Sequence, residues 1–281
     1  MTKYLIVFLL LIPPSQFGAA QLVDTTRSNE GIARKVYAGM VNSLEWYDIP
    51  IALVDVAQLA LVPQNPSGKL IRYPPSAFDE EVQSRIGVSG SGFISNRIGE
   101  AEGIALFGTR FLYTLGSDLM GNHITSLDYQ RTFIFYKSLV YTYSLTMLAK
   151  NLVYRERPDK SDSKSYFSGH SSTAFCTASY LSLELGDWFE RWETTRSNPT
   201  LKRGMQIGST VCLYGTAAYV AYARMKENKH YFSDVAVGAV VGTVVGALVY
   251  KAYAPQLSPR AADVSLSYAG DNPTLALWVR F

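Results

Sequence analysis

Charged residues are scarce in this sequence: they make up 17% of the 281 residues, whereas hydrophobic residues make up 48%. A chain this apolar is not disordered, and its length allows one large core or at most two modest ones. Positive charge is also limited, with a formal net charge of +3 and no basic run that contains interleaved aromatic residues. The composition therefore gives no support for nucleic acid as a partner.

Cysteine is nearly absent, with Cys176 and Cys212 as the two examples. Each lies in an apolar stretch with helical spacing. If the helices that carry them meet at a common rim, Cys176 lies about 9 Å and Cys212 about 18 Å from that rim, at ~1.5 Å per residue. Because this difference in height exceeds the reach of a disulfide, we expect two buried thiols.

The first twenty residues are typical of an export signal. Lys3 supplies a positive start, residues 4–12 form an unbroken apolar run, and residues 18–20 are small enough for cleavage. The apolar run is about half as long as a membrane span requires. We therefore expect residues 1–20 to be a signal peptide and the mature chain to be exported, either periplasmic or associated with the outer membrane.

Apolar residues recur at helical rather than strand spacing along most of the chain. We predict an all-α fold, a bundle of about six core helices that occupies residues 21–260. The expected helices are 31–61 with a break near Pro50, 95–119, 127–153, 171–188, 204–225 and 231–252. Residues 63–92 and 190–203 are rich in turn-forming residues and are predicted to be loops.

The last twenty residues change character. Apolar and small or polar residues alternate on both sides of a Gly-Asp-Asn-Pro turn at 270–273, which predicts a β-hairpin at 261–281. Its ending in Phe281 resembles the closing strand of an outer-membrane barrel. However, two strands cannot close a barrel, and a lone hairpin is marginal in water. We therefore expect the hairpin to pack on the helical body.

The sequence also bears on membrane insertion. Residues 204–223 and 235–250 carry no charge, and the second stretch has three glycines spaced four apart, which allows close helix approach. However, Asp55, Arg110 and Lys137 lie in the middle of expected helices, where charges are costly in lipid. This pattern favours a soluble domain with peripheral membrane contact, and an integral membrane protein is the alternative.

One polar segment follows the third expected helix. Lys150 and Arg157 stand seven residues apart, about two helical turns, so both can face one way at a helix end. Pro158 disfavours helical backbone at Arg157 and is expected to end the helix there. An arginine at such a junction can bind phosphate oxygens with both arms of its guanidinium. A solvated basic helix end is the simpler interpretation of this segment alone.

The chain has three histidines, and two lie in comparable segments. Ser168, Gly169 and His170 precede an apolar run, at a predicted helix N-terminus where backbone N–H groups and the helix dipole favour an anion. His170 can protonate a leaving group near neutral pH. Alone, these residues are equally consistent with a helix cap and a surface histidine. His123 lies in a Gly-Asn-His loop and is expected at the surface.

The second histidine belongs to a third segment. Arg224 ends one uncharged stretch and His230 starts the next. Asp234 follows His230 by four residues, one helical turn later on the same face. A carboxylate there can accept a hydrogen bond from one imidazole nitrogen and leave the other as a nucleophile. An ordinary helix cap explains this segment equally well on its own.

Together, the three segments resemble the signature of the type-2 phosphatidic acid phosphatases, which share a core with class A acid phosphatases and vanadium haloperoxidases. That signature reads K-x6-R-P, then P-S-G-H, then S-R-x5-H-x3-D. It matches over about residues 127–252, at Lys150, Arg157, Pro158, Ser168, Gly169, His170, Arg224, His230 and Asp234.

Two positions depart from this signature. Phe167 replaces its proline, which makes the loop less rigid, and Ala223 replaces its serine, which removes one hydroxyl donor. Losing such a donor costs on the order of 1–3 kcal/mol. Ser171 and Ser172 are candidates to supply the missing hydroxyl.

The resemblance implies a mechanism. His230 attacks phosphorus to form a phosphohistidine, Asp234 orients His230, and His170 protonates the leaving group and then activates water. The phosphate oxygens are held by Lys150, Arg157, Ser168, Gly169 and Arg224. The resemblance implies no metal or other cofactor, because protein cations stabilise the charge, and it implies that vanadate inhibits.

The sequence thus predicts a metal-independent phosphohydrolase for phosphomonoesters, with lipid phosphates and diphosphates among its candidate substrates. Two alternatives stay open: a vanadium-dependent haloperoxidase that uses the same site, and a catalytically inactive phosphate- or lipid-binding module at the outer membrane. The retained His170, His230 and Asp234 argue against the inactive module, because binding alone needs no nucleophile with an orienting carboxylate.

Overall fold

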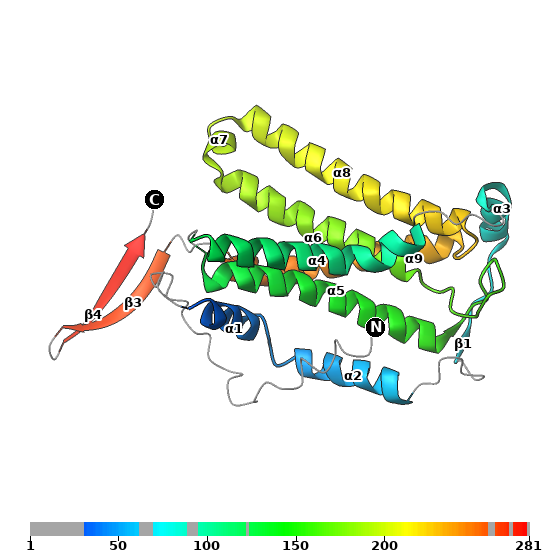
Figure 1. Cartoon of the computed structure of the whole chain (residues 1–281), viewed down its shortest axis with the longest axis horizontal. Helices are drawn as coiled ribbons and strands as arrows, with labels where there is room; N and C mark the ends of the chain where they lie inside the picture. Colours follow the sequence, from blue (N-terminus) through cyan, green and yellow to red (C-terminus); the bar gives the residue numbers. More distant parts are fainter. Residues whose placement is uncertain are drawn as a thin grey trace.

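A computed structural model describes residues 31–61, 70–88, 95–121, 124–257, 262–269 and 272–279. The predicted signal peptide at 1–20 and His123 lie outside the described residues. Helices dominate the described part of the chain, which confirms the all-α class. The long helices lie side by side along one axis, with α3 at one end of the bundle and α7 near the other (Figure 1).

The helices of the described residues agree well with the predicted ranges. Their bounds are α1 Ile32–Asn42, α2 Asp48–Leu61, α3 Ala77–Ile86, α4 Ser95–Leu119, α5 Ser126–Leu152, α6 Gly169–Arg191, α7 Glu193–Arg196, α8 Pro199–Lys226 and α9 Phe232–Leu257. α4 begins and ends where the sequence predicted, and the ends of α5, α6, α8 and α9 differ from their predicted ends by at most five residues.

The helix predicted at 31–61 is divided before Pro50 rather than at it. α1 ends at Asn42 and α2 begins at Asp48, whose Oδ2 accepts a hydrogen bond of 2.6 Å from the backbone N–H of Glu45. Pro50 then lies in the first turn of α2, where its missing N–H costs no helical hydrogen bond. The break is therefore set by the turn between the two helices.

The prediction of a loop over 63–92 is wrong for α3. Ser76 caps this helix by accepting from the backbone N–H of Asp79, and Asp79 accepts in return from the backbone N–H of Ser76. This reciprocal capping box satisfies two donors that would otherwise lack partners at the helix start. The loop predicted at 190–203 likewise contains the short helix α7 and the first turn of α8.

α6 lies in the centre of the bundle and packs closely against α9. A Cβ added to Gly242 would lie 2.0 Å from the carbonyl oxygen of Ser172, so only glycine allows this approach. Gly238 and Gly246, one turn to either side, meet α6 in the same way. The glycine spacing noted in the sequence is thus the contact stripe between α6 and α9.

The main hydrophobic cluster lies between α5, α6 and α9. Its buried members are Ile134, Phe135, Leu139, Cys176, Tyr180, Val249, Tyr250 and Tyr253. Cys176 and Cys212 are both free, as expected, but only Cys176 is buried. The prediction of two buried thiols is wrong for Cys212, because its position on α8 points out of the bundle.

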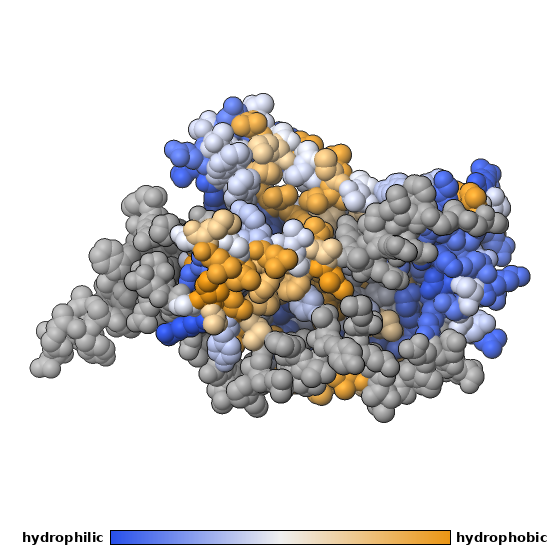
Figure 2. All heavy atoms as spheres, in the orientation of Figure 1, coloured by the Kyte–Doolittle hydropathy of each residue, from blue (hydrophilic) through white to orange (hydrophobic). Residues whose placement is uncertain are grey.

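Much of the remaining interior is polar, whereas large apolar side chains lie outside. Buried ion pairs join Lys137 to Asp48 at 2.7 Å and Lys35 to Asp118 at 2.7 Å. Exposed apolar residues occur on several helices, including Leu53, Leu112, Val211, Val240, Val244 and Leu248. In the view of Figure 2, hydrophobic residues occupy the middle of the bundle, between hydrophilic residues near α3 and near α7.

Within the described residues, one helical segment is long and apolar enough to cross a membrane. This segment, Phe232–Pro255, has 24 residues; its most apolar window has a mean hydropathy of 2.0, and 33% of that window is buried within the protein.

The strands form two small sheets. β1 (Ile71–Arg72) pairs in parallel with β2 (Val153–Tyr154), directly after α5. β3 (Ala262–Ala269) and β4 (Asn272–Val279) pair antiparallel, with Ala269 opposite Asn272. The packing of β3 and β4 on the helical body stays a prediction.

Candidate active site

The ends of four helices meet at the end of the bundle where α3 lies: the C-terminal ends of α5 and α8 and the N-terminal ends of α6 and α9 (Figure 1). This end, which we call the rim, brings together the three sequence segments. Burial, together with the neighbouring Arg224, His230, Lys150 and Arg157 side chains, lowers the pKa of His170 to about 3. The two histidines and three cations thus share one electrostatic environment.

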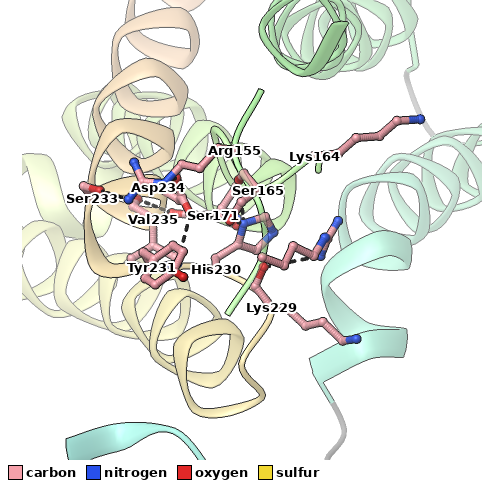
Figure 3. Close-up of polar contacts among 12 residues, drawn as sticks. Arg155, Lys164, Ser165, Ser171, Lys229, His230, Tyr231, Ser233, Asp234 and Val235 are labelled. Atoms are coloured by element: carbon pink, nitrogen blue, oxygen red, sulfur yellow. Dashed lines mark hydrogen bonds and ion pairs between the residues drawn. The ribbon is translucent and has the colours of Figure 1, made fainter. Parts of the chain in front are cut away.

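His230 lies just before α9 and is buried. Its Nδ1 is 2.7 Å from the carbonyl oxygen of Ser165 (Figure 3). A carbonyl can only accept, so Nδ1 carries the proton and the neutral ring has its lone pair on Nε2. Burial and the charges of Lys150, Arg157 and Arg224 keep the pKa of His230 well below its usual value. The ring is therefore neutral and nucleophilic at Nε2.

Asp234 is close to His230 but does not accept a hydrogen bond from it. Its Oδ2 is 3.9 Å from the Nδ1 of His230, so the expected direct contact is wrong. The reason is that α9 begins at Phe232, so the four-residue spacing does not span one complete helical turn. Instead, Oδ2 accepts from Ser165 Oγ at 2.5 Å and from the backbone N–H of Tyr231 at 2.9 Å.

Ser165 therefore links His230 and Asp234, which were expected to bond directly. Its carbonyl holds His230 and its hydroxyl bonds Asp234, so Asp234 acts on the imidazole through the position of Ser165. The sequence analysis missed this residue. Any residue offers a carbonyl, so no side-chain pattern could have revealed the contact with His230.

The cations reach the rim from different elements. Lys150, in the last turn of α5, donates to the carbonyl of Lys164 at 2.7 Å. Because α5 ends at Leu152 and β2 follows, Arg157 is not on the same helix face as Lys150, and that expectation is wrong. Arg157 nevertheless lies in the electrostatic environment of both histidines.

Both rim arginines are held by carboxylates. Arg157 Nε donates to Asp162 Oδ1 at 2.7 Å, and its Nη1 donates to the carbonyl of Lys229 at 3.4 Å. Arg224, in the last turn of α8, donates through Nη1 to Glu227 Oε2 at 2.8 Å, and this pair is buried. These contacts fix one side of each guanidinium.

The Ser-Gly-His segment lies where the sequence placed it, at the start of a helix. Ser168 is the N-cap of α6, and its hydroxyl accepts from the backbone N–H of Ser171 at 3.4 Å. Gly169 and His170 occupy the first turn. Backbone N–H groups at this position are suited to an anion.

The two departures from the family signature are buried. Phe167 packs edge-on against Tyr166, with ring centroids 6.0 Å apart, and Ala223 is buried in α8. The expected substitutes for the missing hydroxyl bond elsewhere: Ser171 Oγ donates to the carbonyl of Val235, and Ser172 Oγ to that of Gly169. Neither serine is arranged to replace the serine missing at position 223.

Arg155 is a second residue that the sequence analysis missed. It is buried, and its Nη2 donates to Asp79 Oδ2 at 2.7 Å and to Ser233 Oγ at 2.9 Å. Its Nε lies 3.3 Å from Asp234 Oδ1. The only signal was a second arginine in the Arg-Glu-Arg-Pro run, and one such residue does not indicate burial.

Comparison with known proteins finds similarity in the part of the chain that carries the site. The PAP2 superfamily matches residues 131–257, which include all the expected site residues. A lipid A 1-phosphatase of Porphyromonas gingivalis is 34% identical over 99 residues, which cover 34% of this chain and 18% of that protein. A PA-phosphatase related-family protein of Dictyostelium discoideum is 36% identical over 89 residues, which cover 31% of this chain and 30% of that protein.

The matches thus span less than a third of each relative. No solved structure matches the chain significantly. Among the residues that the structure describes, no group of three or more His, Cys, Asp or Glu side chains is placed to hold a metal ion. The motifs, the helical core and the family match agree: residues 131–257 match the PAP2 superfamily, and they include the residues of its signature.

Proposed function

We propose that this protein is a phosphatase that cleaves phosphomonoesters, with lipid phosphates as its substrate class, through a phosphohistidine intermediate. The observation that carries the proposal is the grouping of His170 and His230 with Lys150, Arg157 and Arg224 at one rim. A neutral imidazole surrounded by three cations is suited to attack a dianionic phosphoryl group.

In the first step, the lone pair on His230 Nε2 attacks phosphorus, the P–N bond forms, and the bond from phosphorus to the leaving oxygen breaks. The negative charge of the bound ester offsets the three cations and raises the pKa of His170, so that this imidazole is protonated in the complex and gives its proton to that oxygen. The three cations and the backbone N–H groups at the start of α6 hold the equatorial oxygens. As the His230 ring becomes positive, its Nδ1–H keeps donating to the Ser165 carbonyl.

In the second step, water attacks phosphorus, and His170 accepts a proton from that water. The P–N bond breaks and its electron pair returns to His230, which releases inorganic phosphate. No proton need leave His230 Nδ1 at any point. The role of Asp234 is to hold Ser165 and the Tyr231 backbone in place around the imidazole.

We further propose that the middle of the bundle contacts lipid. Ion pairs and hydrogen-bonded hydroxyls lie inside. For example, the buried hydroxyl of Ser144 donates to Asp55 of α2 at 2.6 Å, whereas Leu53, also on α2, is 58% exposed. This arrangement reverses that of a water-soluble bundle, and it suits helices surrounded by hydrocarbon. A lipid phosphate could then present its headgroup to the rim while its chains stay in the bilayer.

The test of the reaction is phosphate release by the purified full chain, with lipid phosphates in mixed micelles compared with soluble phosphomonoesters. We expect the lipid substrates to have the higher kcat/KM, vanadate to inhibit competitively, and EDTA to leave the rate unchanged. Loss of activity with EDTA would contradict the metal-independent mechanism. Halide oxidation with added vanadate and peroxide would instead favour a haloperoxidase.

The lipid contact is tested separately, by fractionation of cells that produce the full chain. We expect the protein to stay in the membrane fraction after washing with high salt and with alkaline carbonate, and to be released by detergent. Recovery in the soluble fraction after either wash would contradict lipid contact by the bundle. The export predicted from residues 1–20 can be read from the same cells, by the mass of the mature N-terminus.

A further inference from the structure

Helix α3 lies outside the residues that match the family, yet it contacts both sides of the turn between α8 and α9, close in sequence to Arg224, His230 and Asp234. It does so at two points. Near its start, Asp79 bonds the beginning of α9, and near its end, Gln83 bonds the end of α8. The rings of Phe78 and Phe232 meet edge to face, with centroids 5.4 Å apart, and add an apolar contact.

Asp79 makes the more unusual of these contacts. Its Oδ1 accepts from the backbone N–H of Ser233 at 2.9 Å, and its Oδ2 accepts from Ser233 Oγ at 2.9 Å and from Arg155 Nη2 at 2.7 Å. The carboxylate is 1% exposed. Burial by itself raises its pKa, but the hydrogen bonds from Ser233, Ser76 and Arg155 outweigh burial and lower the pKa to about 2.

Arg155 extends this contact to the histidine. Its guanidinium lies against the rings of Tyr73 and Tyr231, at 4.6 and 5.0 Å from their centroids, and it is almost fully buried. Asp79 is the carboxylate that bonds it, while Asp234 Oδ1 lies 3.3 Å from its Nε. A chain of contacts thus runs from Asp79 through Arg155 and Asp234 to Ser165, which bonds His230.

Gln83 holds the other side of the same turn. Its Nε2 donates to the carbonyl of Met225 at 2.8 Å and to Asn228 Oδ1 at 2.6 Å. Asn228 has a φ of 56°, in the left-handed region, so this turn is costly unless neighbouring groups support it. The backbone N–H of Val88, just after α3, also donates to the carbonyl of Lys226 at 2.9 Å.

We propose that Asp79 is a positioning residue for His230, and that it acts through Arg155 and Ser233. This inference rests on the proposed function of His230 as nucleophile. With the charge of Asp79 removed, Arg155 retains Asp234 as its nearest carboxylate and moves toward it. Asp234 then gives up part of its bonding to Ser165 and Tyr231, and the imidazole loses its fixed direction.

The principal variant is Asp79→Asn, which keeps the size of the side chain and removes its charge. We expect kcat to fall by about 10²-fold, as for a misplaced reacting group, while KM changes little because Lys150, Arg157 and Arg224 are untouched. Asp79→Glu should recover part of the rate. Glu81→Gln is the matched control, since Glu81 is exposed on the same helix and pairs with Arg85, and it should leave kcat unchanged.

A second measurement does not depend on turnover. The chain has three histidines, so the ¹⁵N signals of His230 can be assigned by replacing His123 and His170 in turn. In the wild type, we expect His230 to carry its proton on Nδ1. In Asp79→Asn, we expect a mixture of Nδ1-H and Nε2-H forms, whereas Glu81→Gln should give the wild-type signals.

The two measurements separate the possible failures. If Asp79→Asn has wild-type kcat and wild-type His230 signals, the positioning role is wrong, whatever the reaction. If the signals change but no wild-type hydrolysis is found with any phosphate ester, the proposed function is wrong and the positioning of His230 stands. If Asp79→Asn does not fold, Ser233→Ala replaces it in the test, because this variant leaves the pair between Asp79 and Arg155 in place. We expect Ser233→Ala to lower kcat by a smaller factor than Asp79→Asn and to shift the ¹⁵N signals of His230.

Discussion

The rim and the middle of the bundle both bury charged side chains, but they arrange them differently. In the middle, ion pairs join single opposite charges from two helices, as Lys137 meets Asp48 and Arg110 meets Glu184. At the rim, Lys150, Arg157 and Arg224 act together on the same two imidazoles. The paired charges fasten helices to each other, whereas the grouped cations create a site for an anion.

The difference shows how burial should be interpreted in this protein. A buried ion pair is weak evidence for function, because desolvation of both charges offsets most of their attraction. A group of three cations around two neutral histidines goes beyond such pairing: Asp162 and Glu227 each hold one arginine, yet Lys150 and both arginines still act on the same imidazoles. Its presence at the rim is therefore better explained by a bound anion than by stability.

Replacing His230 by alanine should give the largest effect. We expect hydrolysis to fall by at least ~10³-fold, because the attacking atom is removed, while the helical content of the protein is unchanged. Phosphate release and circular dichroism on the same preparation check this. Near-normal hydrolysis by the variant would mean that the rim uses a different nucleophile.

Replacing Lys137 by methionine should affect only stability. The change leaves Asp48 buried without its cation, and loss of one partner of a buried pair costs about 3–5 kcal/mol. We expect a lower midpoint of thermal unfolding with unchanged kcat/KM per folded molecule. The double variant Lys137→Met with Asp48→Asn should recover part of the stability. A fall in kcat/KM would show that the middle of the bundle also contributes to the site.

Replacing Lys150 by glutamine should lower activity and leave stability nearly unchanged. This side chain bonds the carbonyl of Lys164, and the neighbouring Asp162 keeps Arg157 as its partner when Lys150 is replaced. We expect kcat/KM to fall by about 10- to 150-fold, the equivalent of one charged hydrogen bond of about 1.5–3 kcal/mol, with little change in thermal stability. An equal loss of stability in this variant and in Lys137→Met would remove the distinction between the two regions.

The smallest effect is a proton taken up on anion binding. In the empty site, the pKa of His170 is about 3, so this imidazole is neutral at pH 6. Sulfate stays a dianion at that pH; its charge opposes the cations and raises the pKa of His170. Binding should therefore take up a fraction of one proton, and sulfate affinity should fall as the pH rises. Calorimetry in buffers of different ionisation enthalpy measures this, and His170→Gln should abolish the uptake.

The sequence predicted the helices better than the contacts between them. Long apolar periodicity located α4 and α5 within a residue at each end, because the pattern is repeated over about seven turns. Helix α3 was missed although Ser76 and Asp79 form a capping box, since its flanks are rich in proline, glycine and serine. A helix this short has too few periodic positions to stand out from such surroundings.

The site was predicted as a set of residues but not as a geometry. Arg157 and His230 both lie outside the helices, so spacings counted as helical turns wrongly placed Lys150 and Arg157 on one helix face and wrongly predicted a direct hydrogen bond between His230 and Asp234. The contacts that replace them involve a backbone carbonyl at Ser165 and a buried arginine at 155. Neither can be read from residue types, because both depend on how distant segments meet.

The most direct test of the account is to trap the phosphoenzyme. The full chain is mixed with a ³²P-labelled phosphomonoester and quenched in alkali within milliseconds, and the labelled peptide is then identified by mass spectrometry. The account predicts an acid-labile, alkali-stable phosphate on His230, which accumulates further in His170→Gln when the ester has a leaving group that needs no protonation. A label on any other residue, or direct transfer to water without a labelled enzyme under these conditions, would contradict it.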